Sequence, residues 1–410
     1  MKFISFLLFT ILTLIGCNKE ILSTKVNSQP SEKGKQQESI NTALQNGSYK
    51  LFDYTNRNEG NDKNVIISPL SIQFALGMAS NGAKNASLEE LMSVNNLKGS
   101  NLAELNDQLT YLFHQLITAK NGIKVSISDA VFYDRNKVNV KQDYLDAVRK
   151  YYGAEVSELN FKEEQKSLNI INGWIKDNTN GKIEKALDEI SADEFMFLLN
   201  AIYMKADWKN PFVIDATRAG DFTTQSGKKV RVSFMNQRVD ALYSNTEQAM
   251  VVSLPLANDQ LSVAFIMPKK TDINEFISRE FNASYFKSLL TTARNSDLMI
   301  ELPKLEIKQH FDLKAILQSM DVKSPFTGGA DFSAIAGAPG DVYLTKALHD
   351  VYMKMDEKGV EGAAVTTIGV GLTSMPPPAI FNQSYIFIIY DQATGVNLFM
   401  GKVSDPSAVD

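Results

Sequence analysis

Histidine, serine and cysteine are the residues of this chain that could carry nucleophilic or metal chemistry. The 410 residues include only three histidines, His114, His310 and His349, and one cysteine, Cys17. None of the histidines lies in an HExxH motif, and no cysteine cluster has zinc-binding spacing. A G-x-S-x-G turn and a phosphate-binding glycine loop are also missing from the sequence. We therefore expect no cofactor and no metal, and the motifs disfavour a hydrolase.

His349 differs from the other two histidines because it lies within a long alternating segment, residues 342–355. The simplest interpretation is a core histidine whose ring nitrogens are hydrogen-bonded. An enzyme that uses Ser68 or Ser71 as nucleophile with His349 as base is the alternative. We expect His114, on an amphipathic helix, and His310, beside a helix start, to be exposed to solvent or to cap a helix end.

The elements that would position these residues mix helices and strands along the chain. Helices are expected at 38–57, 70–79, 102–117, 144–152, 168–179 and 311–320, and strands at 123–127, 195–204, 230–235, 250–256, 261–267, 298–305, 342–355, 385–390 and 397–403. Ser68 is a candidate N-cap with Pro69 in the first turn, and Ser87 with Glu90 predicts a capping box. Asn200 is the one polar residue in an otherwise apolar strand. The pattern indicates one α+β domain over residues 38–410.

Composition limits the classes of partner. Hydrophobic residues make up 44% of the chain, which is enough for a large core, and the formal net charge is only −5. Acidic and basic residues are mixed along the sequence, so nothing favours binding of nucleic acid.

The first residues indicate export. Residues 1–16 contain one lysine followed by an apolar run that is too short to span a membrane, as in a signal peptide. The run ends Leu14-Ile15-Gly16-Cys17, which resembles the lipobox of bacterial lipoproteins, where the cysteine receives the lipid. Residues 17–37 are polar and predict a flexible tether. We expect a lipid anchor at Cys17 in the bacterial cell envelope, on the periplasmic or extracellular face.

The stretch from Glu357 to Ile380 is unusual because the 19 residues after Glu361 carry no charge. Its glycines and three successive prolines exclude a membrane-spanning helix. Even-numbered positions from Val360 to Val370 are all uncharged, so that face could be buried in a strand. A polar turn at one end and prolines at the other are typical of an exposed loop. A permanent strand and a loop that can become a strand both remain open.

Six separated segments of the chain resemble the serpin family, in the order found there. They are NVIISPLSIQFALGM, INGWIKDNTNGKI, FLLNAIYMKADWKNPF, ADFSAIAG, DEKGVEGAA and FNQSYIFIIYDQATGVNLFMGKV. The resemblance covers the whole chain after the tether and would make this a bacterial lipoprotein-type member. It implies an α+β serpin fold, with about nine helices around three β-sheets and an exposed reactive-centre loop.

The resemblance also implies a function, which is inhibition of proteases rather than catalysis. The target endopeptidase would cut the loop, form a covalent acyl complex and be trapped as the loop inserts into the central sheet. The inhibitor itself would be a monomer. Counting from Glu357 puts the cut bond between Thr373 and Ser374, with Leu372 and Met375 as neighbours. A small β-branched residue there suits elastase-like or subtilisin-like serine proteases, or papain-like cysteine proteases. A non-inhibitory serpin, acting as a cleavable substrate or a binding scaffold, is the alternative.

Further roles are implied at three places along the loop's path. The hinge would comprise Glu357, Gly359, Val360, Gly362, Ala363 and Ala364, the shutter beneath the sheet Ser68, Ser71, Asn200 and His349, and the breach where the loop first enters Trp208 and Lys304, with Lys304 paired to Glu357. Val360 and Gly362 depart from the family, whose inhibitory members usually carry Thr or Ser at the first position and often Ala at the second.

Overall fold

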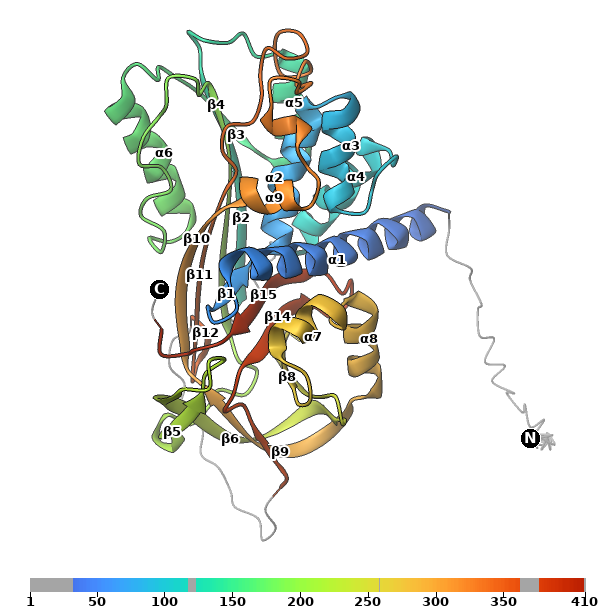
Figure 1. Cartoon of the computed structure of the whole chain (residues 1–410), viewed down its shortest axis with the longest axis vertical. Helices are drawn as coiled ribbons and strands as arrows, with labels where there is room; N and C mark the ends of the chain where they lie inside the picture. Colours follow the sequence, from blue (N-terminus) through green and yellow to red (C-terminus); the bar gives the residue numbers. More distant parts are fainter. Residues whose placement is uncertain (1–31, 117–122, 258, 362–375, 409–410) are drawn as a thin grey trace, which may run out of the picture.

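The structure is a computed structural model, and it describes residues 32–116, 123–257, 259–361 and 376–408. Its first helix, α1, begins at Glu32. The expected tether, residues 17–37, therefore overlaps the start of this helix, because residues 32–37 contain several good helix formers. The structure is shown in Figure 1.

The described residues form nine α-helices and two short 3-10 helices, at Ile214–Ala216 and Ser324–Phe326. The α-helices are α1 (Glu32–Glu59), α2 (Pro69–Gly82), α3 (Asn85–Val94), α4 (Leu102–Leu116), α5 (Gln142–Tyr152), α6 (Glu164–Asn178), α7 (Ile273–Arg279), α8 (Ala283–Thr292) and α9 (Leu313–Ser319). Helix α2 begins as the sequence predicts, since the Ser71 N–H donates to Ser68 Oγ at 3.3 Å. Nearly every residue of α2 is buried, so it lies inside the protein.

The strands lie in two hydrogen-bonded sheets. They are β1 (Val65–Ile67), β2 (Ile123–Asp134), β3 (Glu155–Leu159), β4 (Met196–Asp207), β5 (Arg218–Thr223), β6 (Lys229–Asn245), β7 (Ala249–Pro255), β8 (Leu261–Pro268), β9 (Arg294–Pro303), β10 (Leu305–Asp312), β11 (Leu348–Asp356), β12 (Gly359–Val360), β13 (Pro378–Ile380), β14 (Tyr385–Asp391) and β15 (Asn397–Val403). One sheet has the order β10-β11-β12-β4-β2-β3, and the other β1-β15-β14-β8-β7-β6-β9-β13, with β5 beside β6.

The expectation of three sheets differs from this arrangement because of one long strand. The 17 residues of β6 pair with β5 near the start of the strand and with β7 at its end, while most of its length pairs with β9. Strands that could have formed separate sheets are thereby joined into the nine-stranded one.

Helices cover both faces of the six-stranded sheet. Helix α6 lies on one face, whereas α2 and α9 lie on the other (Figure 1). A smaller apolar cluster, with Phe132, Ile171 and Phe197, lies beneath α6. The larger cluster extends from Ile40 to Val403 in sequence.

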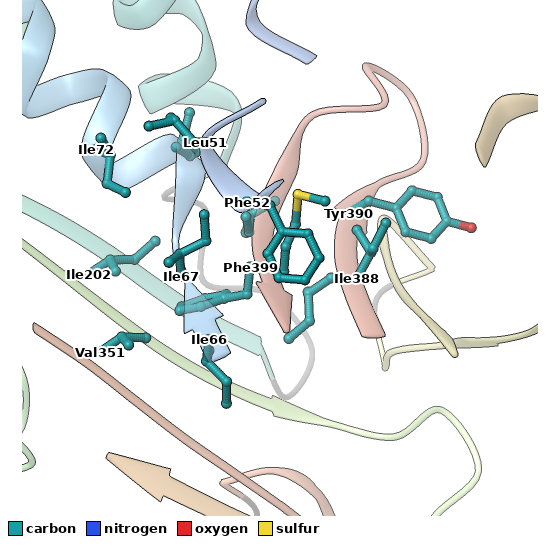
Figure 2. Close-up of a cluster of buried hydrophobic side chains, with 14 of the residues drawn as sticks. Leu51, Phe52, Ile66, Ile67, Ile72, Ile202, Val351, Ile388, Tyr390 and Phe399 are labelled. Carbon is teal, nitrogen blue, oxygen red and sulfur yellow. The ribbon is translucent and has the colours of Figure 1, made fainter. Parts of the chain in front are cut away.

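The centre of the larger cluster is the place where the two sheets approach each other. Figure 2 shows Ile67 of β1 among side chains from both sheets, including Ile202 and Val351 from the six-stranded sheet and Phe399 from the nine-stranded one. All four are buried. The short strand β1 thus connects the sheets through apolar packing, which is favourable because it removes this surface from water.

Ser87 and Glu90 do not form the predicted capping box. Helix α3 begins at Asn85, so both residues lie inside it. Ser87 Oγ instead accepts a hydrogen bond from the Asp331 N–H at 3.0 Å. Glu90 accepts the backbone N–H groups of Lys323 and Ser324, both at 2.7 Å. Both side chains therefore accept hydrogen bonds from residues distant in sequence, so neither forms the local capping contact that was predicted.

Two predicted elements also differ in extent. The helix expected at 311–320 is preceded by β10, which continues to Asp312, and α9 starts only at Leu313. The alternation at 342–355 gives a strand only from Leu348. Residues 343–347 instead line an apolar cavity with residues of α2, α9 and β4. Tyr343 is exposed there and residues 344–347 are half-buried, so these side chains reach the cavity without a strand ladder.

Candidate functional site

The site is organised around a two-residue strand between two long neighbours. In β12, Gly359 pairs with Asp207 of β4, and Val360 pairs with Met355 of β11. Among the described residues, no strand continues β12 between β4 and β11. Val360 is 2% exposed, so the first residue of the uncharged even-numbered face, 360–370, is already buried.

Gly359 has a geometric reason to be glycine. Its φ is +154°, and a Cβ atom built on it would lie 2.1 Å from the Ala206 carbonyl oxygen. No other residue fits this close approach of two backbones without moving β4.

Glu357 is held at the start of this turn. Lys304 Nζ lies 2.9 Å from Glu357 Oε2, and the Thr217 hydroxyl donates to Oε1 at 2.7 Å. Burial raises the pKa of the Glu357 carboxyl, but the hydrogen bonds from Lys304 and Thr217 outweigh it and hold this pKa below its usual value. The structure thus brings the expected Lys304–Glu357 pair together. Thr217 was not anticipated, because nothing in the local sequence relates it to Glu357.

Trp208 connects the end of β4 to the same turn. Its indole Nε1 donates to the Asp356 carbonyl at 2.9 Å, and its backbone N–H donates to the Lys358 carbonyl at 2.9 Å. The side chain is buried and packs edge-on against Phe212. Movement of residues 356–358 would therefore break contacts made by Trp208.

A polar network lies beneath the six-stranded sheet and contains four residues singled out from the sequence. The Ser68 N–H donates to His349 Nε2 at 3.0 Å, and the Ser68 hydroxyl donates to the Leu398 carbonyl at 2.7 Å. The Ser71 hydroxyl donates to Asn200 Oδ1. Ser68, Ser71 and His349 are buried, whereas Asn200 is only partly buried and not fully buried as expected.

The geometry at His349 argues against a serine hydrolase. Burial lowers the pKa of His349 to about 3, so the ring is neutral, and its Nε2 already accepts the Ser68 backbone N–H. The Ser68 and Ser71 hydroxyls donate to Leu398 and Asn200 rather than to this nitrogen. A general base must reach the proton of its nucleophile, and neither hydroxyl offers that arrangement here.

An apolar cavity of about 90 Å³ lies further along the same gap. Its walls include Met196 and Leu198 of β4 on one side, and Thr345 and Ala347 ahead of β11 on the other. It therefore lies between β4 and the segment that leads into β11.

Several expected residues lie outside the described part of the chain. These are Cys17, the hinge residues Gly362, Ala363 and Ala364, and the residues of the expected cut bond, Leu372, Thr373, Ser374 and Met375. Within the described ranges, no helix is long and apolar enough to cross a membrane. The same residues contain no group of three or more His, Cys, Asp or Glu side chains suited to a metal ion.

Comparison with known proteins gives consistent matches over most of the chain. Residues 42–406 match the family described as Serpin (serine protease inhibitor). The chain belongs to the serpin family. It is 29% identical over 357 residues to alpha-1-antitrypsin of Sus scrofa, covering 85% of this chain and 83% of that one.

Two solved serpin structures are similar in fold. Tengpin, a thermophilic serpin, matches in its native state with a TM-score of 0.80 at 27% identity, covering 89% of this chain and 93% of that chain. Human thyroxine-binding globulin complexed with thyroxine has a TM-score of 0.82 at 25% identity, covering 91% and 100%. The serpin relatives thus include protease inhibitors and a thyroxine-binding protein, so family membership alone does not assign an activity.

This serpin has a further network residue, Asp129, that sequence reasoning missed. The Asn200 amide donates to Asp129 Oδ1 at 2.8 Å, and the two residues are paired in the β2–β4 register. Asp129 is 3% exposed, and burial raises the pKa of its carboxyl to about 7. The signal was available, because the alternation of Ile123, Val125 and Ile127 puts Asp129 on the same buried face.

Asp129 and His349, two buried titratable groups of this network, should act on stability in opposite directions. Unfolded Asp129 ionises near pH 3.8 but keeps its proton to about pH 7 when folded, so its contribution to stability is lost as pH rises from about 4 to 7. Unfolded His349 protonates near pH 6.5 but when folded only near pH 3, so its contribution is lost as pH falls through that range.

We expect Asp129→Asn to become more stable relative to the wild type as pH rises from 4 to 7, and to hold that gain above pH 7. The neutral amide can still accept from Asn200 but carries no buried charge, and the gain should reach about 2–4 kcal/mol. Urea unfolding at a series of pH values measures it. Asp240→Asn, at an exposed position, is the control. A stability difference between Asp129→Asn and wild type that does not vary with pH would contradict this assignment.

Proposed function

We propose that this serpin is an inhibitor that traps serine endopeptidases of elastase-like or subtilisin-like specificity, or papain-like cysteine endopeptidases. The protease nucleophile would attack the carbonyl of Thr373, the amine of Ser374 would leave, and the acyl-enzyme would be carried away as the loop inserts. Trapping requires insertion to be faster than hydrolysis of the acyl bond.

The observation that carries the proposal is the partly formed strand β12. Val360 faces the core, while the side chain of Glu361 points to the other face and is 17% exposed. The buried side chain of Val360 is oriented as an even-numbered residue of an inserted strand would be. Addition of a strand to paired edges is a general mode of binding, and serpin loop insertion is a recognised case of it.

Continuation of the two β12 registers by residue count would give Thr366 and Ile368 partners of matching polarity. Thr366 would stand opposite both Asn200 and His349, where its hydroxyl could join the polar network. Ile368 would stand opposite Leu198 and Ala347, which line the apolar cavity. At these two positions the loop residue and its partners have matching polarity, which supports insertion of this sequence in this register.

The direct test is incubation with an elastase-type protease followed by denaturing electrophoresis, with papain in parallel. We expect an adduct that survives denaturation, because the acyl bond is covalent. Trypsin is the control, since the expected bond lacks the Arg or Lys that trypsin needs. A clean cut without an adduct would instead support the non-inhibitory alternative, a serpin that serves as a substrate or scaffold.

Two loop variants make this test specific to insertion. Ile368→Arg should convert the serpin into a substrate, because the inserted strand would bury an unpaired charge at a cost of several kcal/mol. Thr367→Arg changes the neighbouring odd-numbered position, whose side chain would face outward, and should keep the adduct. Equal adduct yields from the two variants would contradict the proposed register.

We also propose that the chain is exported and attached to a bacterial membrane by a lipid on Cys17, with residues 38–410 as its single serpin domain. The sequence of residues 1–17 supports the anchor. Incorporation of labelled palmitate should occur in the full chain and be lost in Cys17→Ser, with Ser28→Ala as the control. Equal labelling of full chain and Cys17→Ser would contradict the anchor.

A further inference from the structure

We propose that Lys182 is a positioning residue that clamps the hinge at Glu361 and so restrains loop insertion, an inference that rests on the proposed inhibitory function. Glu361 is the last described residue before the expected loop, and β12 ends immediately before it. β12 ends there although both neighbouring strands continue, and two features of Glu361 account for this.

The first feature is the backbone conformation of Glu361. Its N–H donates to the Lys354 carbonyl at 3.2 Å, as the β11–β12 register requires. Its φ is +56°, which is the left-handed region that a residue with a side chain seldom adopts. Continuation of the strand requires a negative φ, so Glu361 must rotate before the next residue can pair.

The second feature is the position of the Glu361 side chain. Its carboxylate forms an ion pair with Lys182 Nζ, and the side chains are 17% and 30% exposed respectively. The same ammonium lies 5.0 Å from the centre of the Tyr352 ring on β11. Burial first, and then the charge of Glu361, raises the pKa of Tyr203 on β4 to about 12. Glu361 is therefore held among groups from both strands that flank the gap.

Lys182 is fixed by the connection between α6 and β4. It follows Asn180 and Gly181, which have φ values of +53° and +75° and form a tight turn. The Asn180 amide donates to the Tyr203 hydroxyl at 3.2 Å, which ties this turn to β4. The neighbouring lysines near the hinge have other partners, since Lys354 pairs with Glu306 and Lys304 with Glu357.

Rotation of Glu361 into an extended conformation would carry its carboxylate away from its present position beside Lys182. The Lys182–Glu361 ion pair therefore stabilises the present state, in which only Gly359 and Val360 of the described residues pair between β4 and β11. A state in which more of the loop is paired is less favourable by comparison. Its loss should loosen the hinge and speed insertion, which favours trapping over hydrolysis of the acyl bond.

The first test needs no protease and uses hydrogen exchange of the backbone amides of residues 359–361 in the full chain. Lys182→Ala should raise their exchange rate about three- to tenfold, the size expected for a partly buried ion pair. Lys182→Arg should restore the wild-type rate. Lys185→Ala, which breaks the exposed Lys185–Asp188 pair on the same connection, is the matched control. Exchange in Lys182→Ala equal to that of the wild type would overturn the clamp.

The second test measures the fraction of protease recovered as adduct. It should rise in Lys182→Ala and in Glu361→Gln, and the double variant should match either single variant because both remove one interaction. If the effects of the two single substitutions multiplied in the double variant, this result would contradict the clamp. A wild-type chain that forms no adduct would refute the proposed function, and with it any effect on insertion, while hydrogen exchange would still decide whether Lys182 holds the hinge.

Discussion

In the part of the chain that the structure describes, strands β4 and β11 lie on either side of a position that β12 occupies for only two residues. β4 is paired with β2 along residues 196–206, yet on its other edge the described chain pairs with it only at Ala206 and Asp207. β11 is likewise paired with β10 over its length but with β12 only at Met355 and Asp356. Backbone N–H and C=O groups at such edges favour pairing with a further strand. The hinge, the buried network and the apolar cavity all lie along this one gap.

The groups beneath the gap make its middle polar and its far end apolar. Asn200 joins Ser71 to Asp129 across β2 and β4, while His349 accepts from Ser68 on the other side. A buried network of this kind specifies one arrangement, because any displacement leaves polar groups without partners. Burial pushes the pKa values of Asp129 and His349 in opposite directions, so both side chains are neutral over the same range of pH. The network beneath the gap is thus held by hydrogen bonds between neutral side chains rather than by ion pairs.

Much of this fold follows from periodicity in the sequence, and most of what does not depends on contacts between distant residues. Ser68 caps α2 as its local sequence predicts, and the alternation around Asn200 gives a strand of the expected kind. Ser87 fails as a cap because its hydroxyl is used by Asp331, which is 244 positions away. Thr217 could not be linked to Glu357 for the same reason, since they are separated by 140 positions. Asp129 was predictable in principle, because only its parity in the strand was needed. The conformation of residues 362–375 lies outside the described chain.

The proposed trapping mechanism requires the intact fold to be less stable than the fold with the loop inserted. Thermal melting of the chain before and after a single proteolytic cut near Thr373 measures this most directly, with the two pieces kept together. We expect the cut chain to melt at a much higher temperature, because the freed loop can complete the ladder between β4 and β11. A cut chain that melts at the same temperature as the intact one, or below it, would show that no such strand is added and would contradict the mechanism.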